Sequence, residues 1–144
     1  MIDLTKLEKH ATVDGGHKWG DQVRLFNYSN YCCKILRLKY PHVKGSYHCH
    51  DKKFETWTVL DGVVMVRISR TSEEEILTLE AGDILDIVRR IPHQFWSLEP
   101  SSILEVSTHD DDKDTFRYNE DDGRFYNEDG IKLLNYWERE KLHH

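Results

Sequence analysis

Two histidines and a glutamate lie close together in the segment HCHDKKFETWTVLDG, residues 48–62. His48 and His50 are two residues apart, so on a β-strand both imidazoles point to the same side. Glu55 lies five residues beyond His50, an odd step that would face the other side of one continuous strand, so we expect residues 51–53 to turn the chain. Imidazoles and carboxylates are ligands that divalent transition metals prefer. The spacing is compatible with a metal site that is completed by a ligand from elsewhere, but an isolated His-x-His is more often a pair of surface or core histidines, so the spacing alone does not decide between the two.

The elements that must position these residues are predicted to be short strands. Runs rich in β-branched and aromatic residues recur at the spacing of a sandwich or barrel. In chain order they are YCCKILRLKY, ETWTVL, VVMVRI, ILTL, ILDIV, HQFWSL and SILEVS. Asp61-Gly62 separates the second run from the third, and Asp-Gly in such a place predicts a β-hairpin. Near the end, Gly130–Leu142 has apolar residues at helical spacing and predicts a short C-terminal helix.

Composition limits the class of protein. The 144 residues fit one domain, because no Pro/Gly-rich linker divides them. A formal charge of −6 argues against nucleic acid as a partner. No apolar run approaches the length of a membrane span, and the first residues lack the apolar core of a signal peptide. The three cysteines have no framework spacing, which indicates reduced thiols, and we expect a cytoplasmic protein.

Two motifs in the chain resemble those of the cupins, small β-barrels with a metal in their interior. The first motif is His-x-His, four residues, Glu, six residues and Gly, and it matches His48, His50, Glu55 and Gly62. The second motif places a His eleven residues after a Gly, and here His93 follows Gly82 at that interval. The two motifs occur in the order of the family, with predicted strands around them.

The cupin resemblance implies an all-β fold, a jelly-roll barrel or double-stranded β-helix, as a single domain over residues 1–144. The barrel core is expected at about 17–117, followed by an acidic loop and the short helix at 118–144. The metal ligands implied are His48, His50, Glu55 and His93. This set suits Zn, Mn, Fe, Co or Ni. Cupin barrels also tend to pair, so the resemblance implies a homodimer.

Two turn positions depart from the cupin motifs. The first motif usually begins with Gly six residues before its first His, where this chain has His42. The second usually has Pro and then Gly before its His, where this chain has Val88 and Arg90, with Pro92 directly before the His. Because Gly tolerates positive φ and other residues do not, we expect either different turns or local strain.

Most of the chain is similar to the cupin domain of mannose-6-phosphate isomerases fused to mannose-1-phosphate guanylyltransferases, and to small cupins of sialic-acid pathways. The segments that carry the likeness are HKWGD, CKILRL, HDKKFETWTVLDG, AGDILDI and ILEVSTHDDDKDTFR. The isomerase domain commonly has Gln at the position of His48. The resemblance implies a metal-dependent aldose–ketose isomerase that acts on a small sugar or sugar phosphate.

Isomerisation needs a proton carrier beside the sugar and cations for a phosphate group. Glu105 is the candidate proton carrier, and the alternative for it is a structural ion pair with a lysine or arginine of the barrel. The candidate substrate-binding residues are Trp57, Lys53, Arg89, Arg90 and Arg117. His17 is expected at the surface. The alternating aspartates at 110–114 lack the Gly and Glu of a calcium loop and predict a solvated acidic loop.

Two other functions share the same metal ligands. One is a cupin that binds a sugar or a metal without catalysis, because the nucleotidyltransferase that accompanies the isomerase domain is not in this sequence. The other is an iron-dependent dioxygenase, because three histidines and one glutamate also suit iron. The ligand set by itself does not separate these functions.

Overall fold

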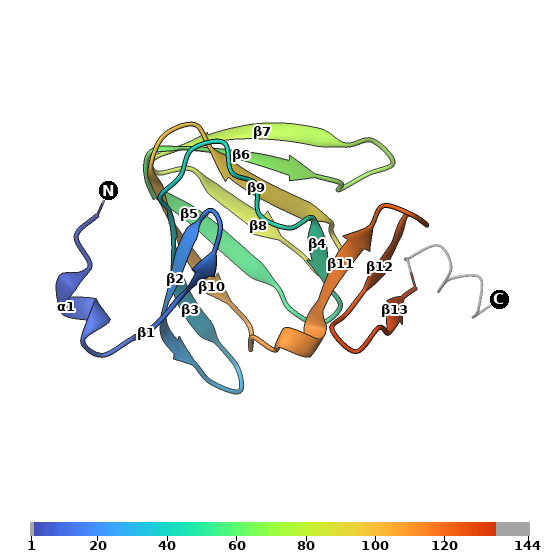
Figure 1. The fold of residues 1–144 in the computed structure, drawn as a ribbon, viewed down its shortest axis with the longest axis horizontal. Coiled ribbons are helices and arrows are strands. Elements are labelled where there is room, and N and C mark those ends of the chain that lie inside the picture. The colour runs from blue at the N-terminus through green and yellow to red at the C-terminus, as the bar shows by residue number, and fades with distance from the viewer. Residues whose placement is uncertain (1, 135–144) are drawn as a thin grey trace.

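The computed structural model describes residues 2–134, which form two antiparallel sheets. The strands of the first sheet are β1 (Thr12–His17), β2 (Gly20–Asn27), β3 (Cys32–Leu38), β5 (Glu55–Asp61), β8 (Ile84–Ile87) and β10 (Ser101–Ser107). Those of the second are β4 (His48–His50), β6 (Val63–Ile68), β7 (Glu75–Glu80), β9 (His93–Ser97), β11 (Thr115–Asn119), β12 (Arg124–Tyr126) and β13 (Lys132–Leu133). The two sheets face each other as a jelly roll (Figure 1).

The strand orders show how the chain alternates between the sheets. The first sheet has the order β1-β2-β3-β10-β5-β8, and the second has the order β13-β12-β11-β4-β9-β6-β7. The described helical residues are one turn of α-helix, α1 (Thr5–Glu8), and one 3₁₀ turn, η1 (Asp112–Asp114). No helix in residues 2–134 is long and apolar enough to cross a membrane.

The core lies between the sheets and follows from strand alternation. In β5 the buried side chains are Glu55, Trp57 and Val59, with less buried residues between them. The same period of two places alternate residues of β6 and β9 inside. Among the buried inward residues of these three strands, the titratable ones, Glu55 and His93, lie near one end, and the polar Ser97 lies at the other end of β9. The barrel therefore has an apolar body and a polar interior region.

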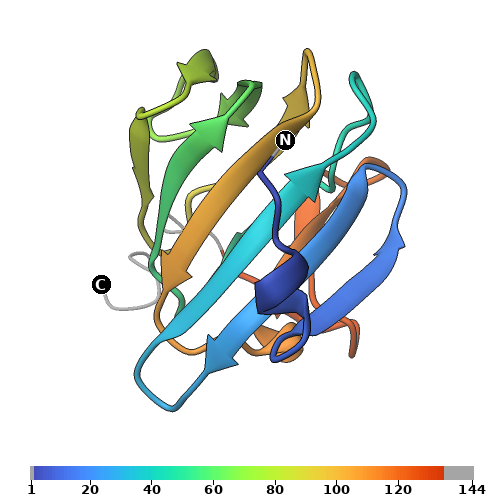
Figure 2. The same ribbon diagram turned by 90° about the vertical axis from the view of Figure 1, so that its left-hand side faces the viewer.

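The N-terminal segment covers part of the outer face of the first sheet. Leu4 packs with Val23 and Ile35 in a small apolar cluster there. Figure 2 shows α1 lying against this face. Arg37 of β3 donates to Asp21 over 2.6 and 2.7 Å and also contacts Glu8, so the segment is held by charge as well as by apolar contact.

The hairpin predicted at Asp61-Gly62 is wrong. β5 pairs with β8 and β10, whereas β6 pairs with β7 and β9, so the chain crosses between the sheets at this point. Gly62 has φ +83°, and a Cβ atom there would lie 2.0 Å from Ser101 Oγ and 2.7 Å from Pro100 O. A glycine is required because the crossing strand passes directly against the loop before β10.

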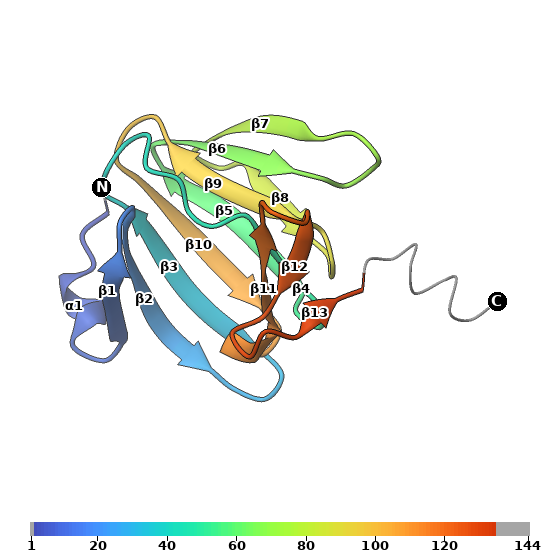
Figure 3. The ribbon, with the colours of Figure 1, turned by 45° about the vertical axis from the view of Figure 1, so that its right-hand side comes forward.

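The C-terminal helix predicted at Gly130–Leu142 is also wrong where it can be tested. Lys132–Leu133 forms β13 and pairs with Phe125 and Tyr126 of β12. Figure 3 shows β11, β12 and β13 as a meander at the edge of the second sheet. Leu133 is buried with Cys49 and Phe116, so its apolar side chain packs against the second sheet and does not form part of a helix face. Residues 135–142 of the prediction lie outside the described part of the chain.

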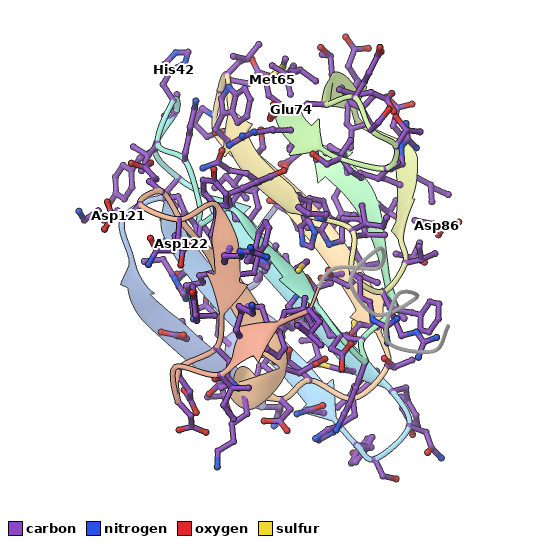
Figure 4. The ribbon with its side chains drawn as sticks, turned by 90° about the vertical axis from the view of Figure 1, so that its right-hand side faces the viewer. His42, Met65, Glu74, Asp86, Asp121 and Asp122 are labelled. Carbon is purple, nitrogen blue, oxygen red and sulfur yellow. The ribbon has the colours of Figure 1, made fainter. Side chains whose placement is uncertain are left out.

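Both turn positions that lack the motif glycine have positive φ. His42 has φ +68° and Arg90 has φ +67°, and they are the non-glycine residues in that region among residues 2–134. The turns of the motif are therefore kept and carry the expected strain. Pro41 precedes His42, as proline does in turns whose next residue has positive φ. His42 is exposed, and its side chain points away from the barrel (Figure 4).

We expect His42→Gly to stabilise the protein by about 1 kcal/mol, because a side chain in the left-handed region costs about 1–2 kcal/mol. The backbone hydrogen bond from His42 N to Ser97 O, at 2.7 Å, needs no side chain and stays available. Urea unfolding of the two proteins measures the difference. The matched control is His10→Gly at another exposed position, outside the positive-φ region, which should lose stability. Equal losses in both variants would contradict strain at His42.

Candidate metal centre

The metal ligands that the sequence predicts come together inside the barrel. β4 pairs with β9 through His48 and His93, so these two histidines lie directly opposite each other. His50 is two residues further along β4, on the same side. Glu55 begins β5 in the other sheet and faces the same interior. The structure therefore brings His48, His50, Glu55 and His93 together from three strands.

The expected turn at residues 51–53 is built around Asp114. Its carboxylate accepts backbone N–H hydrogen bonds from Asp51 at 3.0 Å, Lys52 at 3.1 Å and Lys53 at 3.0 Å. Three consecutive amides directed at one carboxylate define the turn. Because of this turn, Glu55 faces the same interior as His50 in spite of the odd number of residues between them. Asp114 is buried, so the prediction of a solvated loop is wrong for this residue.

The candidate ligand atoms lie close to one another in the barrel interior. One nitrogen from each of His48, His50 and His93 lies within 4.8 Å of the other two. Glu55 Oε2 lies 3.4 Å from His50 Nε2 and 3.2 Å from His93 Nε2. A metal bonded at about 2.0–2.2 Å to such atoms leaves comparable spacings between them.

Hydrogen bonds on the other ring nitrogen orient each imidazole. His50 Nδ1 lies 3.1 Å from Asp114 O, and His93 Nδ1 lies 2.8 Å from Ile91 O. His48 Nδ1 lies 2.7 Å from Ser46 Oγ. Because a backbone carbonyl only accepts, His50 and His93 donate from Nδ1 and keep a lone pair on Nε2. Both rings therefore offer a free nitrogen to the interior.

Glu55 has its two oxygens in different surroundings. Oε1 lies 3.4 Å from Trp57 Nε1 and 3.5 Å from Lys53 Nζ, both of which can donate to it. Oε2 faces the histidines. The indole and the ammonium therefore orient the carboxylate, so that one oxygen remains for a metal.

Buried polar atoms without hydrogen-bond partners show that these residues fit a divalent metal. His50 Nε2, His93 Nε2 and Glu55 Oε2 are buried and have no hydrogen-bond partner among the described residues. A buried polar atom without a partner costs about 1–3 kcal/mol, and here three of them face one another. A metal ion would satisfy all three at once. Three neutral imidazoles and one carboxylate carry a charge of −1, which suits a divalent cation.

Electrostatics keep Glu55 and His48 in the protonation states that bind a metal. Burial raises the pKa of Glu55, but Lys53 and His93 outweigh it and hold that pKa well below its usual range. Burial, followed by the neighbouring histidines, lowers the pKa of His48 well below its usual value. At neutral pH the carboxylate is therefore ionised and His48 is neutral.

A cavity of about 570 Å³ opens onto the ligands. Of the predicted catalytic and substrate-binding residues, Glu105, Trp57, Lys53 and Arg117 line it. Arg89 and Arg90 do not, which corrects their placement. They line a second cavity of about 610 Å³, where Arg89 stacks over Phe54 and Arg90 binds Asp51. The second motif's strained turn directs these arginines away from the histidines.

A buried cluster of charges adjoins the metal ligands. Lys53 Nζ lies 3.4 Å from Glu105 Oε2 and 2.9 Å from Asp110 Oδ1, and Lys34 Nζ lies 2.7 Å from Asp110 Oδ2. Asp110 therefore anchors two lysines and is not the solvated residue that was predicted. Glu105 pairs with Lys53, as the ion-pair alternative predicted, and it also lines the cavity.

The charges in this cluster shift one another's protonation. Burial lowers the pKa of Lys53, but Glu105, Glu55 and Asp110 outweigh it and raise that pKa above its usual value. Burial raises the pKa of Asp110, but Lys53 and Lys34 outweigh it and hold that pKa well below its usual value of 3.8. Burial raises the pKa of Glu105, with Lys53 opposing and Glu55 adding to the rise.

Several cavity residues were not predicted from the sequence. His17 was expected at the surface, but it lines the cavity together with Trp19 and Gln22. The position of His17 depends on an irregularity in strand pairing, for which the sequence carries only the weak signal of Gly15-Gly16.

The three cysteines are buried and free, and burial raises the pKa of Cys49 to about 12.

Comparison with known proteins shows the fold class. No family model and no curated protein matches the chain. KdgF from Halomonas sp. is similar with a TM-score of 0.61 and 16% identity, over 70% of this chain and 90% of that one. Oxalate decarboxylase from Bacillus subtilis gives 0.65 and 20%, over 76% of this chain and 30% of that one. The Lactobacillus farciminis oxalate decarboxylase formate complex gives 0.66 and 19%, over 76% and 34%.

The chain thus spans about a third of the oxalate decarboxylases and nearly all of KdgF. Together with the two facing sheets, these similarities show a jelly-roll fold like that of these proteins. The fold class predicted from the sequence is confirmed. Inside that fold the chain holds a three-histidine cluster with an adjacent glutamate, a donor set that suits a divalent metal ion.

We expect the chelator-treated protein to bind one divalent transition metal per chain and His50→Ala and His93→Ala to lose that binding, because each removes a buried ligand. Metal at 100 times its Kd should raise the free energy of unfolding of the wild type by about 2.7 kcal/mol. Metal analysis and thermal unfolding with and without metal measure both effects. His10→Ala, at an exposed position, is the control. Unchanged metal content in the two ligand variants would contradict the site.

We expect Asp110→Asn to lower the free energy of unfolding at pH 7 by about 3 kcal/mol, because it removes the carboxylate that lies nearest to two buried lysines. The folded-state pKa of Asp110 is depressed, so its contribution is present above its unfolded pKa and declines as pH falls below about 4. Urea unfolding between pH 3 and 7 should show the two proteins converging at low pH. Asp112→Asn, an exposed change on the same loop, is the control. A difference that stays constant with pH would refute the assignment.

Proposed function

We propose that this protein is a metal-dependent isomerase that interconverts the aldose and ketose forms of a sugar or sugar phosphate. The observation that carries the proposal is a buried carboxyl group that lines the cavity beside Glu55 and lies outside the metal-ligand set. Glu105 is buried, lines the cavity and shares Lys53 with the ligand Glu55, at 3.4 and 3.5 Å. A metal centre with an adjacent proton carrier is the minimum that this reaction needs.

The chemistry assigns a role to each group. The reaction moves a proton from C2 to C1 of the sugar through an enediol, while the hydroxyl proton on O2 moves to O1. The three histidines and Glu55 would hold a divalent metal, which would supply a Lewis acid for the carbonyl and hydroxyl oxygens. Glu105 takes the proton from C2 and returns it to C1. Lys53 places a positive charge beside Glu105 and holds that carboxyl group toward the cavity.

Other cavity residues support a sugar phosphate. Arg117 is exposed on β11 and lines the cavity, where its guanidinium can bind a phosphate group in a bidentate manner. Trp57 holds Glu55 through its indole N–H and shields the ligands from water. A volume of about 570 Å³ lies in the range for a small-molecule site. Mn(II) centres are named for the oxalate decarboxylase of Bacillus subtilis, which supports a divalent metal in this fold. A homodimer and a cytoplasmic location remain predictions.

The test follows hydrogen exchange rather than net conversion. Metal-loaded protein is incubated in D₂O with mannose 6-phosphate and related sugar phosphates, and loss of the C2 proton is measured by NMR. We expect exchange in the wild type and a fall of at least about 100-fold in Glu105→Gln, because general acid–base groups contribute at least that much. Metal content of this variant should be unchanged. Glu99→Gln, at an exposed position, is the matched control.

Each other outcome has a defined meaning. Absence of exchange across the panel in protein with confirmed metal would refute the isomerase for these sugars. Iron binding with oxygen uptake would identify a dioxygenase, and sugar binding without exchange would identify a binding module. Full exchange in Glu105→Gln would remove the proton carrier from the proposal.

A further inference from the structure

The β1–β2 hairpin places two further polar side chains, those of Asp14 and His17, in the wall of the cavity. Asp14 pairs with Gln22 and His17 pairs with Gly20, so two residues of β1 lie opposite one residue of β2. Residues three apart on a regular strand face opposite sides. The extra residue of this bulge brings His17 back to the side of the strand on which Asp14 lies, so that both side chains line the cavity. Bulges that redirect a side chain in this way are common next to active sites.

Contacts on several sides hold the His17 ring. Its Nε2 lies 3.0 Å from Asp14 Oδ2 and 3.2 Å from Gln22 Nε2. The ring stacks on Trp19 with centroids 4.7 Å apart and planes at 22°. The His17 side chain is still 31% exposed, so an oriented imidazole faces the cavity without being closed off from a ligand.

This arrangement leaves hydrogen-bonding capacity for a ligand. Nε2 carries at most one hydrogen, and when that hydrogen is donated to Asp14 the Gln22 amide cannot also donate to the same nitrogen. The amide of Gln22 is then available, and so is Nδ1 of His17, which has no hydrogen-bond partner in the part of the chain that the structure describes. One acceptor nitrogen and one amide side by side match neighbouring hydroxyl groups, each of which donates and accepts.

A row of aromatic rings connects this group to the metal ligands. The row consists of His17, Trp19, Phe95, Trp57 and His93. After the His17–Trp19 stack, successive centroids lie 4.9, 5.8 and 5.5 Å apart, and each of these pairs packs edge to face. The three middle rings line the cavity and supply an apolar surface for the C–H groups of a sugar.

We propose that His17 and Gln22, with Asp14 holding the imidazole, form the subsite for the hydroxyl groups of the sugar that are farthest from its carbonyl carbon. This inference rests on the isomerase proposed above and narrows its substrate class. The substrate is a polyhydroxylated chain long enough to reach from the metal ligands across the aromatic row to β1. His17 determines specificity and takes no part in the proton transfer.

The test measures binding without turnover. The probes are D-mannitol and D-mannitol 6-phosphate, which carry the hydroxyl groups but have no carbonyl carbon to isomerise. Zinc-loaded wild type and the variants His17→Ala and Gln22→Ala are titrated with each probe, and the imidazole ¹⁵N signals are followed by NMR. We expect both variants to bind at least tenfold more weakly at unchanged zinc content, and the His17 signals of the wild type to shift on binding.

His109→Ala is the matched control, because His109 is exposed and does not line the cavity. Wild-type affinity in both variants, or no binding of either alditol to the wild type, would overturn the subsite. The result is separable from that of the isomerase. Alditol binding that depends on His17, without C2 exchange, supports the subsite and refutes the isomerase. Exchange with an unchanged KM in His17→Ala supports the isomerase and refutes the subsite.

Discussion

The carboxylate of Asp114 is the contact on which the candidate metal centre depends. It binds three successive backbone amides at residues 51–53, and its own backbone carbonyl holds the imidazole of His50 at 3.1 Å. One residue therefore sets both the turn that brings Glu55 around and the ring orientation of a histidine ligand. Because the amides lie at the start of the segment that leads into β5, any shift of this turn would move Glu55 away from the histidines.

The charges around Glu55 show how the barrel tolerates a polar interior. Lys53 is buried and contacts three carboxylates, those of Glu55, Glu105 and Asp110. An unpaired charge at this depth would cost several kcal/mol, so the lysines and carboxylates depend on one another. The same pairing orients Glu55 and keeps Glu105 beside it. The same network of charges thus stabilises the barrel interior and positions the carboxylates of Glu55 and Glu105.

The strained turns have a related explanation. His42 and Arg90 both have positive φ, and the loops that contain them lead to β4 and β9, which carry the three histidines. The backbone N–H of Arg90 binds the carbonyl of His50 at 2.6 Å, so its strained conformation contributes directly to the position of a ligand. The surrounding hydrogen bonds impose these conformations on residues that would otherwise avoid them.

The sequence by itself predicted the fold class and the strands of the barrel core, because alternating burial depends only on neighbouring residues. The resemblance of two motif spacings to those of cupins predicted the donor set His48, His50, Glu55 and His93. Pairing between distant strands decided the rest. The crossing at Gly62, the strand at Lys132–Leu133 and the entry of His17 into the cavity each depend on which strands hydrogen-bond and in what register. Local propensity carries little of that information, because register is settled by contacts between segments far apart in the chain.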